Sequence, residues 1–356
     1  MPLGLPVPVD LAPMLARAVD TVPAGDYAYE PKWDGYRCLL FRDGDDVVLG
    51  SRSGKALTRY FPELVDAVLA SALPRRCALD GEIVVPVAGR LDWDRLSDRI
   101  HPSAARVREL AAATPASFVA FDLLADGDDS CLDLPFSDRR ARLERVLEPV
   151  DPPLHLSRVT HDVDVARGWF DTFEGAGLDG VVAKPVGARY SPGRRTMLKV
   201  KHQRTADTVL AGYRPHKRSS AARPLLGSML LGLWDDDGVL QFVGGCAAFA
   251  DGVRADLAAM LDELRVDAGD HPWTSGERGE DDRRPENEHR WSGAKDQAFV
   301  PLDPRVVVEV AYDQLQSRRF RHATQFVRFR PDRDPASCTY DQLDVPAAYD
   351  LSDVLQ

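Results

Sequence analysis

The chain has 356 residues, of which 44% are hydrophobic, and a formal net charge of −11 at pH 7. This size and apolar content favour two domains over one, and the absence of any run of about 18 apolar residues excludes a membrane-spanning helix. The five cysteines are scattered without a Cys-x-x-Cys pair, so we expect neither a zinc site nor a redox pair. Free thiols in a reducing compartment are typical of a cytoplasmic protein.

The first half of the chain predicts a mixture of strands and helices. Residues 36 to 51 form two β-favouring runs around Asp43-Gly44-Asp45, which is the pattern of a β-hairpin. Residues 58 to 71 place their apolar side chains on one helical face. From apolar runs and capping residues we expect further strands at 78–85, 118–124 and 181–184, and helices at 137–148, with Ser137 as N-cap, and 163–175.

After residue 204 the pattern changes to short β-rich runs, which one expected helix at 253–264 interrupts. Five strands and one helix suit a small Greek-key barrel of the OB type, a fold that binds oligonucleotides. Other small barrels fit this periodicity equally well. Residues 268 to 298 are rich in Gly, Pro and charged residues, which predicts a long surface loop.

The charge distribution allows two interpretations. A net charge of −11 argues against a basic nucleic-acid-binding surface, but many basic residues gather in clusters. These clusters lie at Arg194 to Arg204, Arg214 to Arg218 and Arg318 to Arg333. Either a positive groove lies on an acidic body, or the clusters are solvated faces without a partner.

Five short motifs follow one another and suggest nucleotide transfer. They are Lys32-Trp33-Asp34-Gly35, Ser51-Arg52-Ser53-Gly54-Lys55, Asp80-Gly81-Glu82-Ile83, Asp179 to Lys184, and Leu198-Lys199-Val200-Lys201. A lysine that attacks a phosphate must be neutral, so its pKa must fall well below about 10.4. Burial beside other cations lowers a lysine pKa in this way. For Lys32, the cations expected to do so are Arg37, Lys184, Lys199 and Lys201.

The ordered set resembles the covalent nucleotidyltransferases, a superfamily that comprises ATP-dependent DNA ligases, RNA ligases and mRNA capping enzymes. The resemblance spans residues 28 to 333 and is strongest to the bacterial ATP-dependent ligase C and the ligase domain of the end-joining ligase D. It implies an α+β fold, in which a nucleotidyltransferase (adenylation) domain of antiparallel sheets and helices precedes a C-terminal OB-fold β-barrel. The two domains would cover residues 1–203 and 204–356.

The resemblance also implies a set of catalytic residues. Lys32 would become covalently adenylated, and Asp34 would help to organise the metal ion and the nick. Lys184, Lys199 and Lys201 would bind the nucleotide and neutralise its α-phosphate.

The implied nucleotide site surrounds the adenosine. Glu30 would bind the adenine amino edge, Arg37 the ribose or the nick phosphate, and Glu82 the ribose hydroxyls. Phe121 would stack on the purine, although a core position fits this residue equally well. Glu82 and Asp179 would bind a metal ion. Most relatives have glutamate in place of Asp179, and the shorter aspartate still offers Mg²⁺ an oxygen ligand.

Contacts with DNA and pyrophosphate are implied for the remaining residues. Arg52 and Lys55 would hold DNA phosphates, since a guanidinium group matches phosphate geometry. For Arg52 the alternative is a surface charge at a hairpin end. Arg330 and Arg333 lie in a version of the family's last motif, with arginine replacing the final lysine, and would bind ATP and orient the pyrophosphate. The alternative for this segment is a solvated charged turn.

The implied function is the ATP-dependent sealing of nicks in duplex DNA through a lysyl-AMP intermediate, in DNA repair or recombination. It requires ATP and Mg²⁺ or Mn²⁺. The expected partners are nicked double-stranded DNA and other DNA-repair proteins, and the enzyme itself is expected to be a monomer in the cytoplasm. Two alternatives stay open: RNA ligation or GTP-dependent capping, and a non-catalytic nucleic-acid-binding protein.

Overall fold

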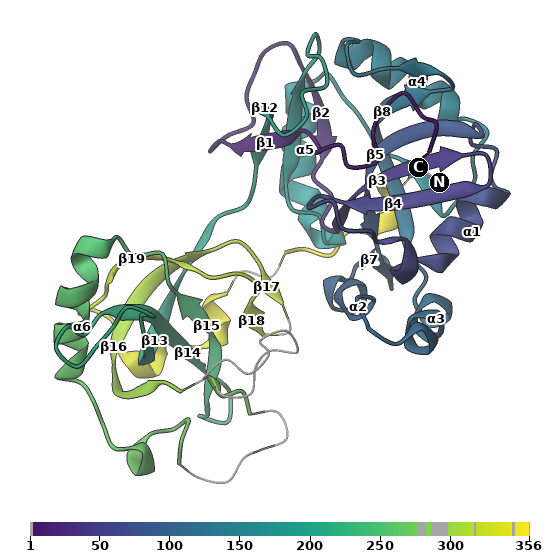
Figure 1. Ribbon diagram of the computed structural model, residues 1–356. Coiled ribbons are helices and arrows are strands. Elements are labelled where there is room, and N and C mark those ends of the chain that lie inside the picture. The colour runs from purple at the N-terminus through teal and green to yellow at the C-terminus, as the bar shows by residue number, and fades with distance from the viewer. Residues whose placement is uncertain are drawn as a thin grey trace. The chain divides into compact units, whose positions relative to one another are not determined.

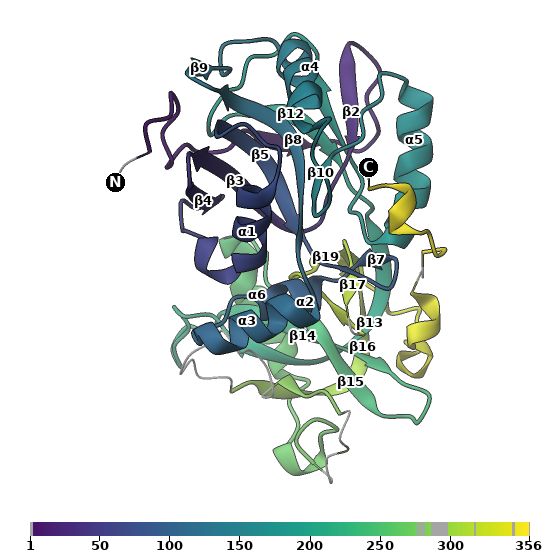
Figure 2. The same cartoon turned by 90° about the vertical axis from the view of Figure 1, so that its right-hand side faces the viewer.

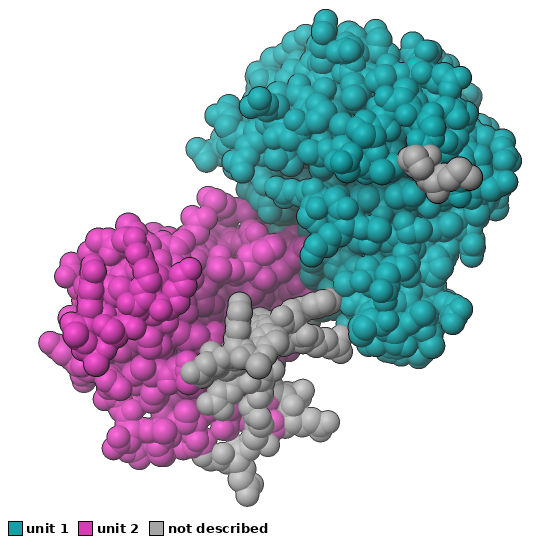
Figure 3. All heavy atoms as spheres, viewed as in Figure 1, with its two compact units in different colours: residues 1–201, 346–356 teal, residues 202–345 magenta. Residues whose placement is uncertain are grey.

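The computed structural model describes residues 3–275, 279, 282–285, 298–316, 318–343 and 346–355. It divides the chain into two compact units (Figures 1 and 3). Unit 1 comprises residues 1–201 and 346–356, and unit 2 comprises residues 202–345. The division expected from the sequence, 1–203 and 204–356, therefore differs mainly in the last residues. These residues belong to unit 1 because Leu351 and Val354 are buried in an apolar cluster of that unit.

Two sheets form the frame of unit 1. The first has the strand order β1 (Leu15–Ala18), β12 (Arg195–Val200), β11 (Val181–Pro185) and β2 (Tyr27–Pro31). β11 runs antiparallel to both of its neighbours, and β1 runs parallel to β12. The register places Val182 opposite Glu30 on one side and opposite Lys199 on the other. Segments far apart in the sequence thus meet on one sheet.

The second sheet contains the predicted hairpin and both of the early apolar runs. Its order is β10 (Leu154–Leu156), β8 (Ser117–Asp126), β5 (Arg76–Val84), β3 (Tyr36–Asp43) and β4 (Asp46–Ser51), and β9 (Asp129–Ser130) pairs with β8. Every residue of β8 except the last is buried, as expected of a strand in the middle of a sheet. β6 (Pro86–Val87) and β7 (Arg90–Leu91) form a separate short hairpin.

Unit 1 also contains helices, some of which pack on these sheets. They are α1 (Pro62–Ala70), α2 (Trp93–Asp98), α3 (Ala104–Ala113), α4 (Phe136–Leu147) and α5 (Val163–Thr172). α4 packs on β8 and α5 packs on β2 (Figures 1 and 2). The Asp162 side chain accepts the backbone N–H groups of the first turn and so caps α5. The expected N-cap Ser137 instead lies inside the first turn of α4, because the helix begins at Phe136.

Unit 2 is built on a five-stranded antiparallel sheet with one apolar core. Its strand order is β15 (Leu240–Cys246), β14 (Leu226–Trp234), β13 (Arg204–Pro215), β16 (Val300–Tyr312) and β19 (Gln325–Phe329). The predicted helix is α6 (Arg254–Asp262), which packs on β14 (Figure 1). β17 (Leu315–Gln316) and β18 (Arg319–Phe320) pair as a short hairpin.

The surface loop predicted at 268–298 is wrong for its first part. Trp273 is 2% exposed, and its indole N–H donates to the carbonyl oxygen of Leu240 at 2.7 Å. A segment poor in apolar residues thus contributes an anchor to the core of unit 2. Residues 276–278, 280–281 and 286–297 of the predicted loop lie outside the described residues.

Two further features of the structure are the state of the cysteines and the length of the helices. All five cysteines are buried free thiols. In the parts of the chain that the structure describes, no helix is long and apolar enough to cross a membrane.

Candidate active site

One face of the first sheet of unit 1 carries several of the predicted site residues. Side chains two residues apart on a strand share a face, and so do residues directly opposite each other on neighbouring strands. Val182 lies opposite both Glu30 and Lys199, and Lys184 lies two residues further along β11. Glu30, Lys184 and Lys199 therefore project from the same face.

The Asp179 carboxylate binds two lysines at the end of this face. The Lys32 N–H donates to the Gly180 carbonyl oxygen at 2.8 Å, and the Asp179 N–H donates to the Lys32 carbonyl oxygen at 2.9 Å. These bonds fix Lys32 beside the turn that precedes β11. The Nζ atoms of Lys32 and Lys201 each lie 2.6 Å from Oδ2 of Asp179, and Asp179 is buried.

This cluster sets the protonation of Lys32. Burial has the largest single effect and lowers the pKa of the Lys32 ammonium, but the carboxylates of Asp179, Asp34 and Glu82 together raise it, and the resulting pKa lies above its ordinary value. Burial would raise the pKa of Asp179, whereas Lys32 and Lys201 hold it below its ordinary value. The depression that the sequence led us to expect for Lys32 is therefore absent from this state. Burial together with Lys201 and Lys32 lowers the pKa of Lys199 instead.

Lys184 belongs to a different contact on the same face. Its Nζ donates to Oε1 of Glu30 at 2.9 Å and to the carbonyl oxygen of Phe121 at 2.8 Å. The same Nζ lies 4.8 Å from the centre of the Phe121 ring. Burial raises the pKa of Glu30 and lowers the pKa of Lys184. Lys184 is thus bound to the two residues predicted to contact adenine, and Lys201 is the lysine that shares Asp179 with Lys32.

Arg37 covers the Phe121 ring and is held by a carboxylate to which the sequence assigned no role. Arg37 Nε and Nη2 donate to the two oxygens of Asp80, which is fully buried. The Tyr190 hydroxyl donates to the same carboxylate at 2.6 Å. The guanidinium carbon of Arg37 lies 4.5 Å from the centre of the Phe121 ring. Asp80 lies within the third motif, but no sequence signal pointed to Tyr190.

Glu82 lies opposite Arg37 across the β3–β5 pairing. Its Oε1 accepts the backbone N–H of Gly35 at 3.2 Å. Burial raises the pKa of Glu82 to about 7, even though Arg37 and Lys32 lower it. A Cβ atom at position 35 would lie 2.1 Å from the carbonyl oxygen of Ile83. The turn after Lys32 therefore requires glycine so that it can approach β5 closely.

Asp179 and Glu82 are the carboxylates expected to bind a metal ion. Both, together with Asp34, act electrostatically on Lys32, which places all three near the same amine. Mg²⁺ commonly binds through one or two carboxylates and completes its shell with waters and substrate phosphates. Among the described residues there is no group of three or more His, Cys, Asp or Glu side chains that could hold a metal. Two nearby carboxylates are nevertheless the kind of donor set that Mg²⁺ uses when phosphates complete its shell.

Arg52 and Lys55 lie in an exposed turn after β4. The Ser51 N–H donates to the Lys55 carbonyl oxygen at 2.8 Å, and the Lys55 N–H donates to the Ser51 hydroxyl at 3.0 Å. Burial and the neighbouring lysines lower the pKa of Lys199, and the charge of Arg52 adds to this effect. The turn thus presents two exposed cations, and one of them, Arg52, acts electrostatically on Lys199 of the first sheet.

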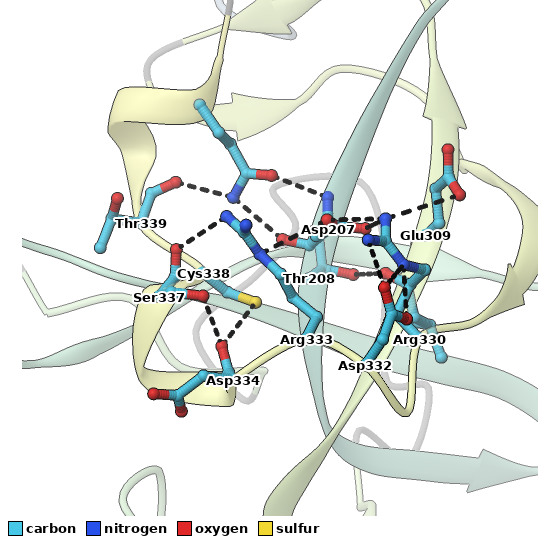
Figure 4. A network of polar contacts seen from close by, with 12 residues as sticks. Asp207, Thr208, Glu309, Arg330, Asp332, Arg333, Asp334, Ser337, Cys338 and Thr339 are labelled. Carbon is cyan, nitrogen blue, oxygen red and sulfur yellow. Dashed lines mark hydrogen bonds and ion pairs between the residues drawn. The ribbon is translucent and has the colours of Figure 1, made fainter.

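Arg330 and Arg333 lie in unit 2 and are bound to carboxylates (Figure 4). Arg330 Nη1 donates to both oxygens of Asp207 at 3.0 Å, and its Nε and Nη2 each bind Asp332 at 2.9 Å. Arg333 is held more loosely. Its Nε lies 3.5 Å from Asp207, and its Nη2 donates to the Ser337 carbonyl oxygen at 3.4 Å. Arg330 is therefore engaged along both edges of its guanidinium group, whereas these contacts of Arg333 are longer.

Comparison with known proteins assigns a family to this arrangement. Residues 11–201 match the ATP dependent DNA ligase domain, and residues 222–333 match the ATP dependent DNA ligase C terminal region. The chain belongs to the ATP-dependent DNA ligases. The two matches, with the antiparallel sheets of both units, confirm the predicted α+β fold of an adenylation domain followed by an OB domain.

Mycobacterial DNA ligases C are similar to this ligase over nearly their whole length. DNA ligase C2 of Mycolicibacterium smegmatis is 52% identical over 97% of each chain. DNA ligase C of Mycobacterium tuberculosis is 50% identical over 99% of each chain. A solved structure of a Lig E DNA ligase, 17% identical, gives a TM-score of 0.53 and covers 89% of this chain and 99% of its own. At that identity the likeness shows a shared fold.

Family membership also decides between the alternatives that the sequence left open. The protein is an enzyme that ligates DNA and uses ATP, as predicted. We therefore set aside the alternatives, which were RNA ligation, GTP-dependent capping and a non-catalytic role.

Proposed function

We propose that this ligase seals nicks in duplex DNA through a covalent Lys32–AMP intermediate. The observation that carries the proposal is the contact of Lys32 and Lys201 with one buried carboxylate oxygen of Asp179, each at 2.6 Å. An amine able to attack and a cation able to bind phosphate thereby lie beside the same atom. Transfer of AMP to a lysine requires such a pairing of nucleophile and positive charge.

In the first step the Lys32 Nζ attacks the α-phosphorus of ATP. The ammonium first releases a proton to solvent, and the neutral amine then forms a bond between Nζ and phosphorus. The bond from phosphorus to the bridging oxygen breaks, so that pyrophosphate leaves, and the nitrogen releases a second proton to solvent to give the phosphoramidate. Lys199 and Lys201 neutralise the charge that develops on the phosphate oxygens. Asp179 raises the pKa of Lys32 in the free enzyme, so this contact must loosen before the amine can react.

We assign the adenosine to the residues around Phe121. Glu30 binds the adenine amino edge, Glu82 accepts from the ribose hydroxyls, and Arg37 contacts the ribose or the nick phosphate. Phe121 is 7% exposed, and Arg37 and Lys184 lie over its ring. The purine must therefore shift one of these cations in order to stack. Stacking of a base on an aromatic ring is typically worth ~1–3 kcal/mol, which offsets part of that cost.

A divalent ion, Mg²⁺ or Mn²⁺, is assigned to Asp179 and Glu82, with Asp34 organising the site. When bound, it would neutralise phosphate charge. Hard oxygen donors such as carboxylates suit both ions.

The later steps pass AMP to the 5′-phosphate at the nick and then let the 3′-hydroxyl displace AMP. Arg52 and Lys55 are assigned to DNA phosphates, because both side chains are exposed and guanidinium pairs well with phosphate. Arg330 and Arg333 are assigned to the departing pyrophosphate. We place the enzyme, as a monomer, in DNA repair or recombination in the cytoplasm, where nicked DNA and other repair proteins are its partners.

Intact-mass spectrometry after incubation with ATP tests the central step. The wild type should gain the mass of AMP, and Lys32→Ala should not. Lys32→Arg should also fail, because arginine stays protonated and cannot attack. Lys217→Ala, which changes an exposed lysine of unit 2, should keep the adduct. An adduct that persists in Lys32→Ala would contradict the assignment of Lys32 as the adenylated residue. A parallel incubation with GTP checks which nucleotide the enzyme uses.

A further inference from the structure

The segment after unit 2 returns to unit 1 and is firmly seated there. Leu351 and Val354 are 2% and 0% exposed. The Leu351 N–H donates to the Gly89 carbonyl oxygen at 2.7 Å, and Arg158 Nε donates to the Val354 carbonyl oxygen at 3.1 Å. Figure 2 shows this segment, in yellow, beside α5. Both its side chains and its backbone are thus bound.

A glycine in unit 1 makes room for this segment. A Cβ atom at Gly175 would lie 1.9 Å from the Ala347 carbonyl oxygen and 2.7 Å from the Tyr349 N atom. The Tyr349 ring lies 5.2 Å from the ring of Phe173. The backbone of the segment therefore packs directly on the backbone at position 175, at a distance that only glycine permits.

The same segment packs behind the nucleotide residues. Leu351 and Val354 belong to one apolar cluster with Trp33, Phe121 and Leu178. Trp33 follows Lys32 in the chain, Leu178 precedes Asp179, and Phe121 is the residue assigned to the purine. The cluster therefore adjoins the attacking amine, its carboxylate partner and the base-stacking ring.

Hydrogen bonds connect these parts as well. The Trp33 indole N–H donates to the Ser157 hydroxyl at 2.9 Å, and the Ser157 N–H donates to the Ala120 carbonyl oxygen at 2.8 Å. The next residue, Arg158, holds Val354. One short loop thus contacts the residue after Lys32, the strand of Phe121 and the C-terminal segment.

We propose that residues 346–355 are a positioning element of the nucleotide site, in which Leu351 and Val354 hold Trp33 and Phe121 and thereby align Lys32. The proposal rests on the assignment of Lys32 as the adenylated residue. Residues 1–201 contain Lys32 and the residues assigned to the adenosine, yet the apolar cluster beside them also includes residues of a segment that follows unit 2 in the chain.

The test compares variants of the full chain. The double variant Leu351→Ala with Val354→Ala removes two buried side chains from the apolar cluster of Trp33 and Phe121. We expect the maximal rate of enzyme–AMP formation to fall by about tenfold to a hundredfold, because small misplacements of reacting groups reduce rates by such factors. Ser352→Ala with Asp353→Ala is the matched control, because both side chains are exposed, and it should keep the wild-type rate. Leu351→Met should restore most of the rate.

Two further variants separate positioning from other roles. Gly175→Ala places a methyl group against the backbone of the segment and should lower the maximal rate of enzyme–AMP formation, although no residue of the segment itself is substituted. A Gly-Ser insertion after Val345 lengthens the connection between the units and should leave the rate unchanged. If the insertion lowers the rate as much as the alanine pair does, the segment acts as a tether and the proposal is overturned.

Folding is checked by circular dichroism at the assay temperature. A folded alanine pair with the wild-type maximal rate and the wild-type KM for ATP overturns the proposal. If the alanine pair does not fold, Leu351→Val, which removes a single methylene, decides in its place on the same criterion. A wild-type enzyme that carries no AMP on Lys32 would instead overturn the proposed function, so the two failures are distinguishable.

Discussion

Lys32 Nζ and Asp179 Oδ2 lie 2.6 Å apart, although the two residues are 147 positions apart in the chain. The contact favours the protonated form of Lys32, the proposed nucleophile, because the carboxylate raises the pKa of Lys32 against the opposing effect of burial. In the proposed reaction, Lys32 must therefore lose this contact before it can attack. Activation requires that the charge of Asp179 be taken up by something other than Lys32.

Asp179→Asn tests this coupling. Loss of the carboxylate removes the main cause of the raised Lys32 pKa, so the residual adenylation should reach its half-maximal rate at a lower pH than in the wild type. The maximal rate should fall by about a hundredfold, as the loss of one electrostatic group in a catalytic site typically does. Adduct formation measured by mass spectrometry across a pH series checks both effects.

Asp179→Glu is the control for this experiment. It keeps the negative charge and should therefore keep the wild-type pH dependence. An unchanged pH dependence in Asp179→Asn would show that the carboxylate does not govern Lys32.

Glu82 gives a prediction for stability. Its pKa is raised from 4.5 to about 7 by burial, so its contribution to folding is fully present below pH 4.5 and is lost as the pH rises through about 7. Glu82→Gln removes this loss. Since one pKa unit corresponds to ~1.4 kcal/mol, the free energy of unfolding of the variant relative to wild type should rise by roughly 2 kcal/mol between pH 5 and pH 8.

Urea unfolding of unliganded protein at the two pH values measures this difference. Glu109→Gln, at a side chain that is 66% exposed, should show no such change. A Glu82→Gln protein with the same pH dependence as the wild type would mean that Glu82 titrates normally.

Arg333 and Arg330 should behave differently when each is changed to alanine. Arg333→Ala should impair enzyme–AMP formation and spare the sealing of a nick that already carries AMP, because no pyrophosphate leaves in that reaction. Arg330→Ala should in addition lower the stability of unit 2, because the partly buried carboxylate of Asp207 loses a donor. Separate assays of the two steps, with thermal unfolding, distinguish these outcomes. Equal loss of both steps in Arg333→Ala would indicate a structural role for that residue.

The sequence predicted most of the framework around Lys32, because local properties determine it, and the role of Lys32 as the attacking residue stays a prediction. Lys32 lies in a short motif, and the hairpin at 36–51 follows from alternating residues and turn chemistry. The observed hairpin, β3 and β4, lies within this range. The same local evidence misplaced the N-cap of α4 by two residues, at Ser137 instead of Pro135, since serine is an acceptable residue both at an N-cap and in a first turn.

The partners of each charge could not be predicted in this way. Lys184 and Lys201 both follow the family pattern, but only the sheet register and side-chain packing show that Lys184 binds Glu30 while Lys201 binds Asp179. Tyr190 and Asp207 form contacts between distant segments, which no local pattern records. The C-terminal segment escaped prediction for the same reason, because its few apolar residues have meaning only against the surface that they cover.

The last prediction concerns the basic residues on a chain with a net charge of −11. If these residues hold the DNA backbone, nick binding should weaken steeply with salt. Release of counterions from about six phosphates gives a slope near −5 for the logarithm of the binding constant against the logarithm of the salt concentration, from ~0.9 per contact.

Arg52→Ala removes one such contact and should make this slope shallower by about one unit. Adenylation of Lys32 should stay largely unchanged, because ATP is not the assigned partner of Arg52. Arg106→Ala, an exposed arginine on α3 paired with Glu109, should keep the wild-type slope. Binding titrations of nicked duplex at several salt concentrations measure these slopes, and a flat response in the wild type would show that the basic clusters are solvated faces after all.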